Sequence, residues 1–341
     1  MPENPYRLLQ KPQINLARST VLRMWLVNLC AFLAIIQSSL SDSFSSLLIA
    51  VSAVSTAVLA EFLILHKSGK GKTVKDGSAV ATALILSLLL PNQISPVYAV
   101  LGAAFAIVVI KHSFGGLGSN WLNPAAGAWL FIRFSWPESF NNALEGSILS
   151  QGLDGVRASF FASPSPLGNS ISTFLNNTVF SLSRMELPSG YIDLFASNFE
   201  GIIADRGIFA LLLGTILLSA FRVNRSWIPA IYLFVFGFLV LFAGDLPYGG
   251  NFWSGDVIFA ICSGGTLAAA FFLASDPATG AKSDYFIGLA TALGAGLAFL
   301  FRFYGLEPYG AIYSVLFVNA LLPLFRIIEN RKLYGKQGTL L

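Results

Sequence analysis

Glu61 is a carboxylate inside a long apolar run, which extends from Ser45 to Leu65 and ends about one helical turn beyond it. An ionisable side chain at membrane depth is costly and by default indicates a functional site. The nearby end of the run slightly favours the alternative, in which the carboxylate reaches the aqueous interface beside His66 and Lys67. The sequence leaves both interpretations open.

Two aspartates border short apolar segments. Asp76 precedes the segment that begins at Ala79, where a carboxylate can cap a helix N-terminus and is favoured by the helix dipole. Asp276 precedes Pro277, where another apolar segment stops. Each can hold a cation or a cofactor hydroxyl, but capping and turn chemistry explain either aspartate equally well.

Asn120 and Asn123 flank the end of a glycine-rich turn and lead into Pro124. Glycine permits positive backbone dihedrals and close approach, and free amide groups at a helix start can bind an anion or the polar edge of a ring system. A turn that only tightens helix packing is the alternative.

Metal, disulfide and nucleotide chemistry are not predicted. His66 and His112 are the two histidines, and no cysteine or carboxylate lies at ligand spacing from them. Cys30 and Cys262 lie in apolar stretches, so we expect small buried hydrophobic side chains rather than a disulfide. Nucleophile elbows, phosphate-binding loops and dinucleotide fingerprints are absent from the sequence.

The composition is that of a membrane protein. Of 341 residues, 55% are apolar and 11% charged, and the mean hydropathy is +0.69. Water-soluble domains carry about 25% charged residues, and the 30 Phe and 31 Gly fit lipid-facing helices in close contact. A soluble enzyme, a disordered tail and a nucleic-acid binder are therefore excluded.

Ten apolar runs predict an all-α membrane protein with about ten spans. The runs are Met24–Leu40, Ser45–Leu65, Ala79–Leu90, Val97–Ile110, Pro124–Phe134, Ile208–Phe221, Trp227–Ala243, Val257–Ala274, Tyr285–Phe301 and Ala311–Phe325. The third and fifth are shorter than the roughly 17 residues that a straight span needs, and a proline borders each. They predict discontinuous helices, the elements from which transporters build binding sites, unless flanking loop residues extend them.

The basic residues predict the orientation. With ten spans and a cytoplasmic N-terminus, sixteen Lys and Arg fall on the inner side, Lys111 among them, and five on the outer side, among them Arg302. This distribution satisfies the positive-inside rule, so both termini are expected in the cytoplasm.

A weak repeat divides the chain. The segment from Gly77 to Pro91 resembles that from Gly264 to Pro277, and five spans separate the copies, as in an inverted repeat whose ligand sites lie where the halves meet. The predicted parts are a cytoplasmic segment (1–23), two five-helix repeats (24–134 and 207–326), an extracytoplasmic loop (135–206) and a cytoplasmic tail (327–341).

Several motifs carry a family resemblance. They are Asp76-Gly77-Ser78-Ala79, Leu89-Leu90-Pro91, Lys111-His112-Ser113-Phe114-Gly115-Gly116-Leu117-Gly118-Ser119-Asn120, Asn123-Pro124-Ala125-Ala126, Ser263-Gly264-Gly265 and Ala270-Phe271-Phe272-Leu273-Ala274-Ser275-Asp276-Pro277-Ala278-Thr279. Together they resemble the family of membrane subunits that Nqr and Rnf ion-pumping respiratory complexes share (NqrB and RnfD), from about Thr73 to Arg326. The short N-terminus is more similar to RnfD.

The resemblance implies two inverted five-helix halves, with a fold shared with urea transporters, in the bacterial inner membrane. It implies an electron-transfer subunit that is not catalytic alone. Its partners are the other membrane and peripheral subunits of an Rnf complex, which couples ferredoxin–NAD oxidoreduction to sodium-ion or proton translocation. It further implies an FMN that a flavin transferase joins by a phosphoester to a threonine of the outer loop. Whether a second, non-covalent flavin binds stays open, with Asn120, Asn123 and Asp276 as candidate residues.

This sequence departs from the family pattern at the attachment site. The family pattern reads roughly Asp-x-x-Ser/Thr-Gly-Ala-Thr, often followed by Pro-Leu, and serines replace the threonine here. Ser165 precedes Pro-Leu, Ser163 precedes a proline, and Ser159 follows Asp154 at a spacing one residue short. A hydroxyl is what a phosphoester requires, so Ser165 and Ser163 are preferred over Ser159.

Two other functions stay open at this stage. A transporter or channel for a small polar solute suits the inverted repeat and the urea-transporter relation, because discontinuous helices form solute sites as readily as flavin sites. A membrane scaffold without cofactor is consistent with the altered attachment pattern.

Overall fold

The structure is a computed structural model, and every element that it describes is helical. It describes residues 20–67, 76–113, 116, 120–143, 165–180, 187, 190–196, 201–223, 225–276, 283–305 and 307–334. Five described helices are long and apolar enough to cross a membrane: Val21–Ser39, Ser45–Lys67, Trp227–Tyr248, Asp284–Tyr304 and Gly310–Glu329. The chain is therefore a multi-pass membrane protein, as the composition predicts.

The helices of the N-terminal part coincide with the first five apolar runs. They are α1 (Thr20–Ser39), α2 (Ser45–Lys67), α3 (Ser78–Leu89), α4 (Pro96–Phe105) with its π-helical continuation η2 (Ala106–Lys111), and α5 (Pro124–Ser135). Both α3 and α5 have only 12 residues. The two short runs therefore form short helices, and the alternative of extension by flanking residues is wrong.

Short helices follow α5. They are α6 (Pro137–Asn142), α8 (Pro166–Thr178), α9 (Tyr191–Phe195) and α10 (Ile203–Arg206). Backbone contacts tie the last of them to the first half of the chain, since Ile203 N donates to Leu90 O (2.9 Å) and Pro91 forms an isolated bridge with Ile202.

The C-terminal part coincides with the other five runs. Its elements are α11 (Ile208–Ala220), α12 (Trp227–Ala243), the 3₁₀ turn η4 (Leu246–Tyr248), α13 (Val257–Ile261), α14 (Thr266–Ala268) continued by the π-helix η5 (Ala269–Leu273), α15 (Asp284–Phe299) with the π-helix η6 (Leu300–Tyr304), and α16 (Gly310–Tyr334). One predicted span is broken between α13 and α14, where Gly264 and Gly265 have φ of +64° and +68°. Only glycine adopts this conformation at little cost.

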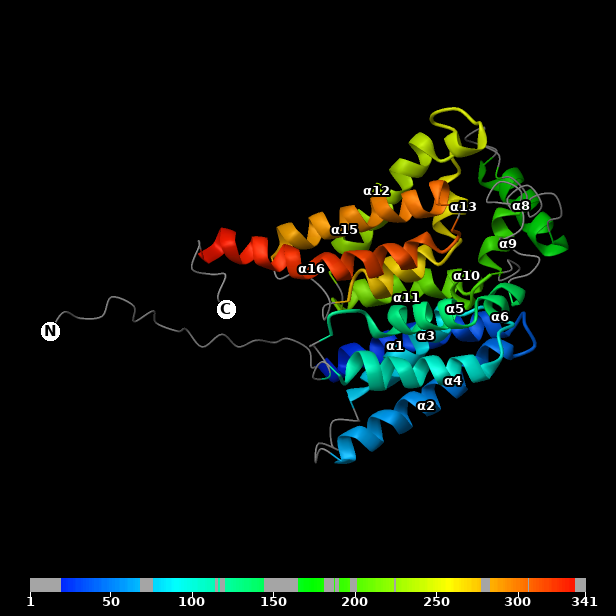
Figure 1. The fold of residues 1–341 in the computed structure, drawn as a ribbon. Helices are drawn as coiled ribbons and strands as arrows, with labels where there is room; N and C mark the ends of the chain where they lie inside the picture. Colours follow the sequence, from blue (N-terminus) through cyan, green and yellow to red (C-terminus); the bar gives the residue numbers. More distant parts are fainter. Residues whose placement is uncertain are drawn as a thin grey trace.

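The bundle has two distinct ends (Figure 1). α1 begins and α16 ends at one of them, which we call the terminal end, whereas α6, α8 and α9 gather at the other, the loop end. α1 to α5 lie together on one side, and α12, α15 and α16 on the other.

Small residues bring α11 against α1. A Cβ at Gly207 would lie 2.6 Å from the backbone oxygen of Ala34, and one at Gly214 would lie 2.9 Å from Cβ of Cys30. Backbones approach this closely in membrane bundles only where side chains are small. Cys30 and Cys262 are both free and buried, which confirms the prediction for the two cysteines.

Candidate functional site

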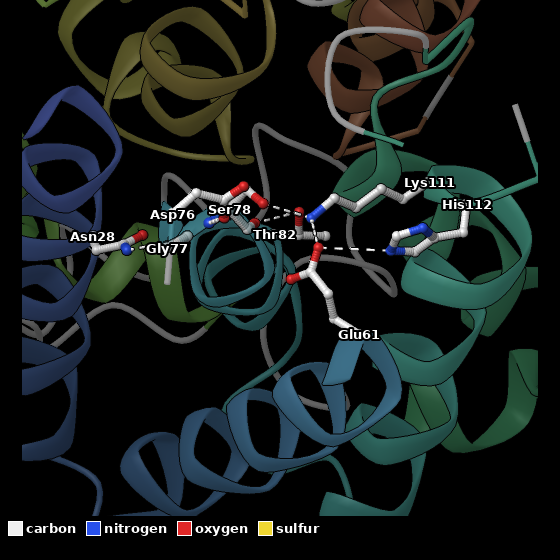
Figure 2. A network of polar contacts seen from close by, with 8 residues as sticks. All are labelled: Asn28, Glu61, Asp76, Gly77, Ser78, Thr82, Lys111 and His112. Carbon is white, nitrogen blue, oxygen red and sulfur yellow. Dashed lines mark hydrogen bonds and ion pairs between the residues drawn. The ribbon is translucent and has the colours of Figure 1, made fainter. Parts of the chain in front are cut away.

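A buried ion pair joins α2 and η2 at the terminal end. Glu61 of α2 and Lys111, the last residue of η2, are each 2% exposed, and Lys111 Nζ lies 2.6 Å from Glu61 Oε1. Figure 2 shows Glu61 between Lys111 and His112. The interpretation that Glu61 reaches the interface beside His66 and Lys67 is wrong, because its carboxylate points into the protein.

The same lysine holds the start of α3. Lys111 Nζ donates to Ser78 Oγ (2.6 Å), and the Ser78 amide donates to Asp76 Oδ1 (2.8 Å). Asp76 thus satisfies a free N–H at this helix start, although Gly77, with φ of +79°, is the residue at the cap position. The aspartate does the capping chemistry, which is one of the two interpretations that the sequence leaves open.

His112 lies on the other side of Glu61, with Nε2 3.6 Å from Oε1. Burial lowers the pKa of His112 below its ordinary value and the charge of Lys111 lowers it further, whereas Glu61 opposes both. The imidazole is therefore neutral at pH 7, and protonation would add a second positive charge beside Lys111.

This lowered pKa predicts acid-dependent stability. A folded-state pKa below the unfolded one gives stability that is present at neutral pH and lost as the pH falls. In thermal scans of the solubilised protein, we expect the melting temperature to fall less between pH 7.5 and pH 5.5 in a His112→Gln variant than in the parent. His66→Gln is the control, because His66 is exposed. Equal losses in parent and H112Q would contradict the prediction.

Asn123 and Asp276 meet across the two parts of the chain. Asn123 Nδ2 donates to Asp276 Oδ2 (3.1 Å), while its Oδ1 accepts from the amides of Ala125 and Ala126 and caps α5. The first free amides of α5 are therefore already occupied. Asn120 lies nearby in sequence and is 6% exposed, and its Oδ1 is a buried acceptor with no donor in the described part of the chain.

Asp276 also borders a small cavity of about 40 Å³, with Tyr232, Thr291 and Asn319 among its lining residues. One water needs about 10–15 Å³ by this measure, whereas drug-sized ligands occupy about 300–1,000 Å³. The cavity therefore has room for a few waters and none for a ring system.

Ser165 is the one attachment candidate that the structure describes, because Ser163 and Ser159 lie outside the described residues. Ser165 is half-buried at the N-cap of α8, where its Oγ accepts from Gly168 N (3.0 Å). Its hydroxyl donates to Asp193 Oδ1, and its backbone N–H donates to Asp193 Oδ2 (2.8 Å). No sequence pattern points to Asp193, which lies 28 residues downstream in α9.

A second buried cation holds the break between α13 and α14. Arg302 of η6 is 1% exposed. Its Nη1 donates to the oxygens of Ala260 and Ser263 (2.6 and 2.9 Å) and to Thr266 Oγ1 (2.9 Å), and its Nη2 donates to Ser263 Oγ (2.6 Å). Ser283, the residue before α15, donates its N–H to Glu329 Oε1 near the end of α16. The start of α15 therefore lies toward the terminal end, and Arg302, which follows the other end of α15, lies toward the loop end.

Asp205 completes this second cluster from the other side of the break. Its Oδ2 accepts from Gly264 N (3.1 Å) and its Oδ1 from Gly265 N (2.8 Å). Successive backbone N–H groups in a turn can form a concave anion site, and here the carboxylate of Asp205 accepts from both N–H groups. The orientation count assigns Lys111 to the inner side and Arg302 to the outer side, and it does not predict that both side chains are buried.

Comparison with known proteins decides the family. A family model described as the NQR2, RnfD, RnfE family matches residues 8–335. The chain belongs to this family. The resemblance of the motifs to NqrB and RnfD is thereby confirmed over nearly the whole chain.

Three relatives, each named as the D component of its complex, cover most of this NQR2, RnfD, RnfE family member. The one from the proton-translocating ferredoxin:NAD(+) oxidoreductase complex of Clostridium ljungdahlii is 29% identical over 94% of both chains. The one from the Na(+)-translocating ferredoxin:NAD(+) oxidoreductase complex of Acetobacterium woodii is 31% identical over 84% of this chain and 82% of its own. The one from the ion-translocating oxidoreductase complex of Shewanella denitrificans is 30% identical over 98% and 99%.

Proposed function

We propose that this chain is the membrane electron-transfer subunit of an Rnf-type complex that couples ferredoxin–NAD oxidoreduction to the translocation of sodium ions or protons. The observation that carries the proposal is the family match over residues 8–335, with relatives that are named as components of such complexes. The chain is not catalytic alone and works with the other membrane and peripheral subunits. It lies in the bacterial inner membrane with both termini in the cytoplasm.

The proposal includes two inverted five-helix halves with a urea-transporter-like fold. Two buried cations support it, because Lys111 and Arg302 each lie in a π-helical end of the fourth long segment of their half. Each bonds a hydroxyl at the first residue of a helix that follows a glycine with positive φ, Ser78 after Gly77 and Thr266 after Gly265. The two sites lie toward opposite ends of the bundle, as an inverted repeat requires.

Ser165 is the proposed attachment residue for FMN. It fits the group because the residue is only half-buried at the loop end, and because Pro166 and Leu167 follow it as in the family pattern. It also begins α8, a 13-residue helix whose N-terminus favours the negative charge of a phosphoester. Bound there, the flavin would supply one- and two-electron redox chemistry to the complex.

Asn120, Asn123 and Asp276 remain the proposed residues for a second, non-covalent flavin. The Oδ1 of Asn120 has no donor among the described residues and fits the N–H of a flavin ring, whereas the amides that Asn123 caps are already bonded. The cavity beside Asp276 is too small for the ring, so Asn120 carries this proposal.

Flavin attachment is tested on the purified complex. We expect denatured parent protein to show in-gel flavin fluorescence at the mass of this subunit, and the peptide with Ser165 to carry the mass of one FMN. Ser165→Ala is expected to abolish both signals, whereas Ser163→Ala and Ser159→Ala keep them. Fluorescence that survives in S165A and disappears in one of the other variants would move the site to that serine.

A solute transporter or channel would give a different result. Vesicles that contain this chain alone would then show flux of a small polar solute, and the solubilised complex would carry no flavin on this subunit.

A further inference from the structure

Asp193 contacts Ser165 through both of its carboxylate oxygens. One accepts the backbone N–H of Ser165 (2.8 Å) and the other the hydroxyl proton. Asp193 is 2% exposed, while Ser165 is half-buried, so the carboxylate approaches from the protein side and leaves part of the serine open. A helix cap needs only the serine oxygen, which already accepts from Gly168 N. The carboxylate is thus an addition to the cap.

Gly168 makes room for this carboxylate. A Cβ at position 168 would lie 2.7 and 2.8 Å from the two carboxylate oxygens of Asp193 and 2.9 Å from its carboxyl carbon. Contacts this short essentially never occur between real Cβ atoms and their neighbours, so any other residue would push Asp193 away. The glycine one turn into α8 therefore places Asp193 against the hydroxyl.

We propose that Asp193 takes the proton of the Ser165 hydroxyl when that hydroxyl is esterified. The inference rests on the proposed attachment of FMN to Ser165. A neutral hydroxyl is a weak nucleophile, and an adjacent general base activates it. Asp193 touches the oxygen that reacts.

The chemistry balances with a flavin dinucleotide as the donor. A phosphoester forms from a hydroxyl only with an activated phosphoryl group, and FAD is a phosphoric anhydride of FMN and AMP. Ser165 Oγ forms a bond to the FMN phosphorus, the anhydride P–O bond breaks, AMP leaves, and the hydroxyl proton passes to Asp193. Nothing is oxidised or reduced. After the transfer, Oγ can still accept from Gly168 N.

The test follows attachment and not the activity of the loaded complex. The complex is purified from cells without the flavin transferase, then given transferase and FAD, and incorporation is timed by in-gel fluorescence and peptide mass. We expect Asp193→Asn to lower the rate at least about 100-fold, the lower range for general-base catalysis. Asparagine keeps the size of the side chain and can accept from Ser165 N, so the melting temperature of the flavin-free complex should not change.

A second variant displaces the carboxylate without removing it. Gly168→Ala is expected to lower the rate as well, because its Cβ occupies the place of Asp193. Matched controls are Asp256→Asn, whose carboxylate bonds Tyr191 and caps α13, and Gly296→Ala, whose Cβ would meet no atom within 4 Å. Both controls should incorporate flavin at the parental rate.

The pH dependence separates proton transfer from packing. Because hydroxide can replace the missing base, the ratio of parental to D193N rates should fall as the pH rises. Parental rates in D193N and G168A, with S165A unlabelled, would overturn the role of Asp193 and leave the attachment site intact. Labelling of S165A at the parental rate would instead overturn the attachment site. If D193N does not fold, G168A decides.

Discussion

Replacing Lys111 with methionine is expected to destabilise the protein by about 3 to 5 kcal/mol, the usual cost of removing one partner of a buried ion pair. Glu61 would keep its charge at 2% exposure with no cation beside it, or would have to take up a proton. Its second oxygen, Oε2, already has no hydrogen-bond partner in the described part of the chain. The Ser78 hydroxyl at the start of α3 would also lose its donor.

A double-mutant cycle separates the pair from the packing. Glu61→Gln alone leaves the ammonium of Lys111 without its counter-charge, whereas the double variant of Glu61→Gln and Lys111→Met has neither charge and should recover most of the loss. The control is Lys67→Met, since Lys67 is exposed at the end of α2, and we expect a change within about 0.5 kcal/mol. Thermal melting of the solubilised protein measures the stability of all four variants: K111M, E61Q, the double variant and K67M. A double variant no more stable than K111M would show that the charges are not coupled.

The helices can be predicted from the sequence because apolar runs are a property of neighbouring residues. The runs at Ala79–Leu90 and Pro124–Phe134 predict short helices, and α3 and α5 are short. The break in the run from Val257 to Ala274 does not follow from the pattern, because apolar residues continue on both sides of it. The signal is the pair Gly264 and Gly265, whose positive φ no side-chain pattern reveals.

The sites can be predicted only in part, because their partners are far apart in the chain. Glu61 is recognisable as costly at membrane depth, but its partner Lys111 is 50 residues away and enters the sequence analysis only as one of the inner-side basic residues. The carboxylate that holds Ser165 escapes sequence reasoning for the same reason, since nothing in the spacing of Asp193 connects it with α8. Tertiary packing, and not local pattern, creates these pairs.

Arg302→Met is expected to lower the free energy of unfolding by about 3 to 5 kcal/mol, as Lys111→Met does. The reason is that the guanidinium makes four hydrogen bonds around the break between α13 and α14. The carbonyl groups of Ala260 and Ser263, at the end of α13, would lose a charged donor. Arg302→Lys keeps the charge on a single nitrogen and should fall between the parent and R302M. The control Arg225→Met removes an exposed pair with Asp284, which is worth at most about 1 kcal/mol.

The break has a natural reporter in Cys262, which is buried directly after α13. If Arg302 fixes the backbone at the break between α13 and α14, a maleimide should label Cys262 faster in R302M than in the parent. Cys30, which packs on Gly214 between α1 and α11, should be labelled at the parental rate. Lys111 and Arg302 share no partners among the described residues, so the stability losses of K111M and R302M should add. Two results would mean that the cations act through global stability rather than each at its own helix start. One is a stability loss in the double variant that differs strongly from the sum of the two single losses, and the other is an equal rise in the labelling rates of Cys30 and Cys262 in R302M.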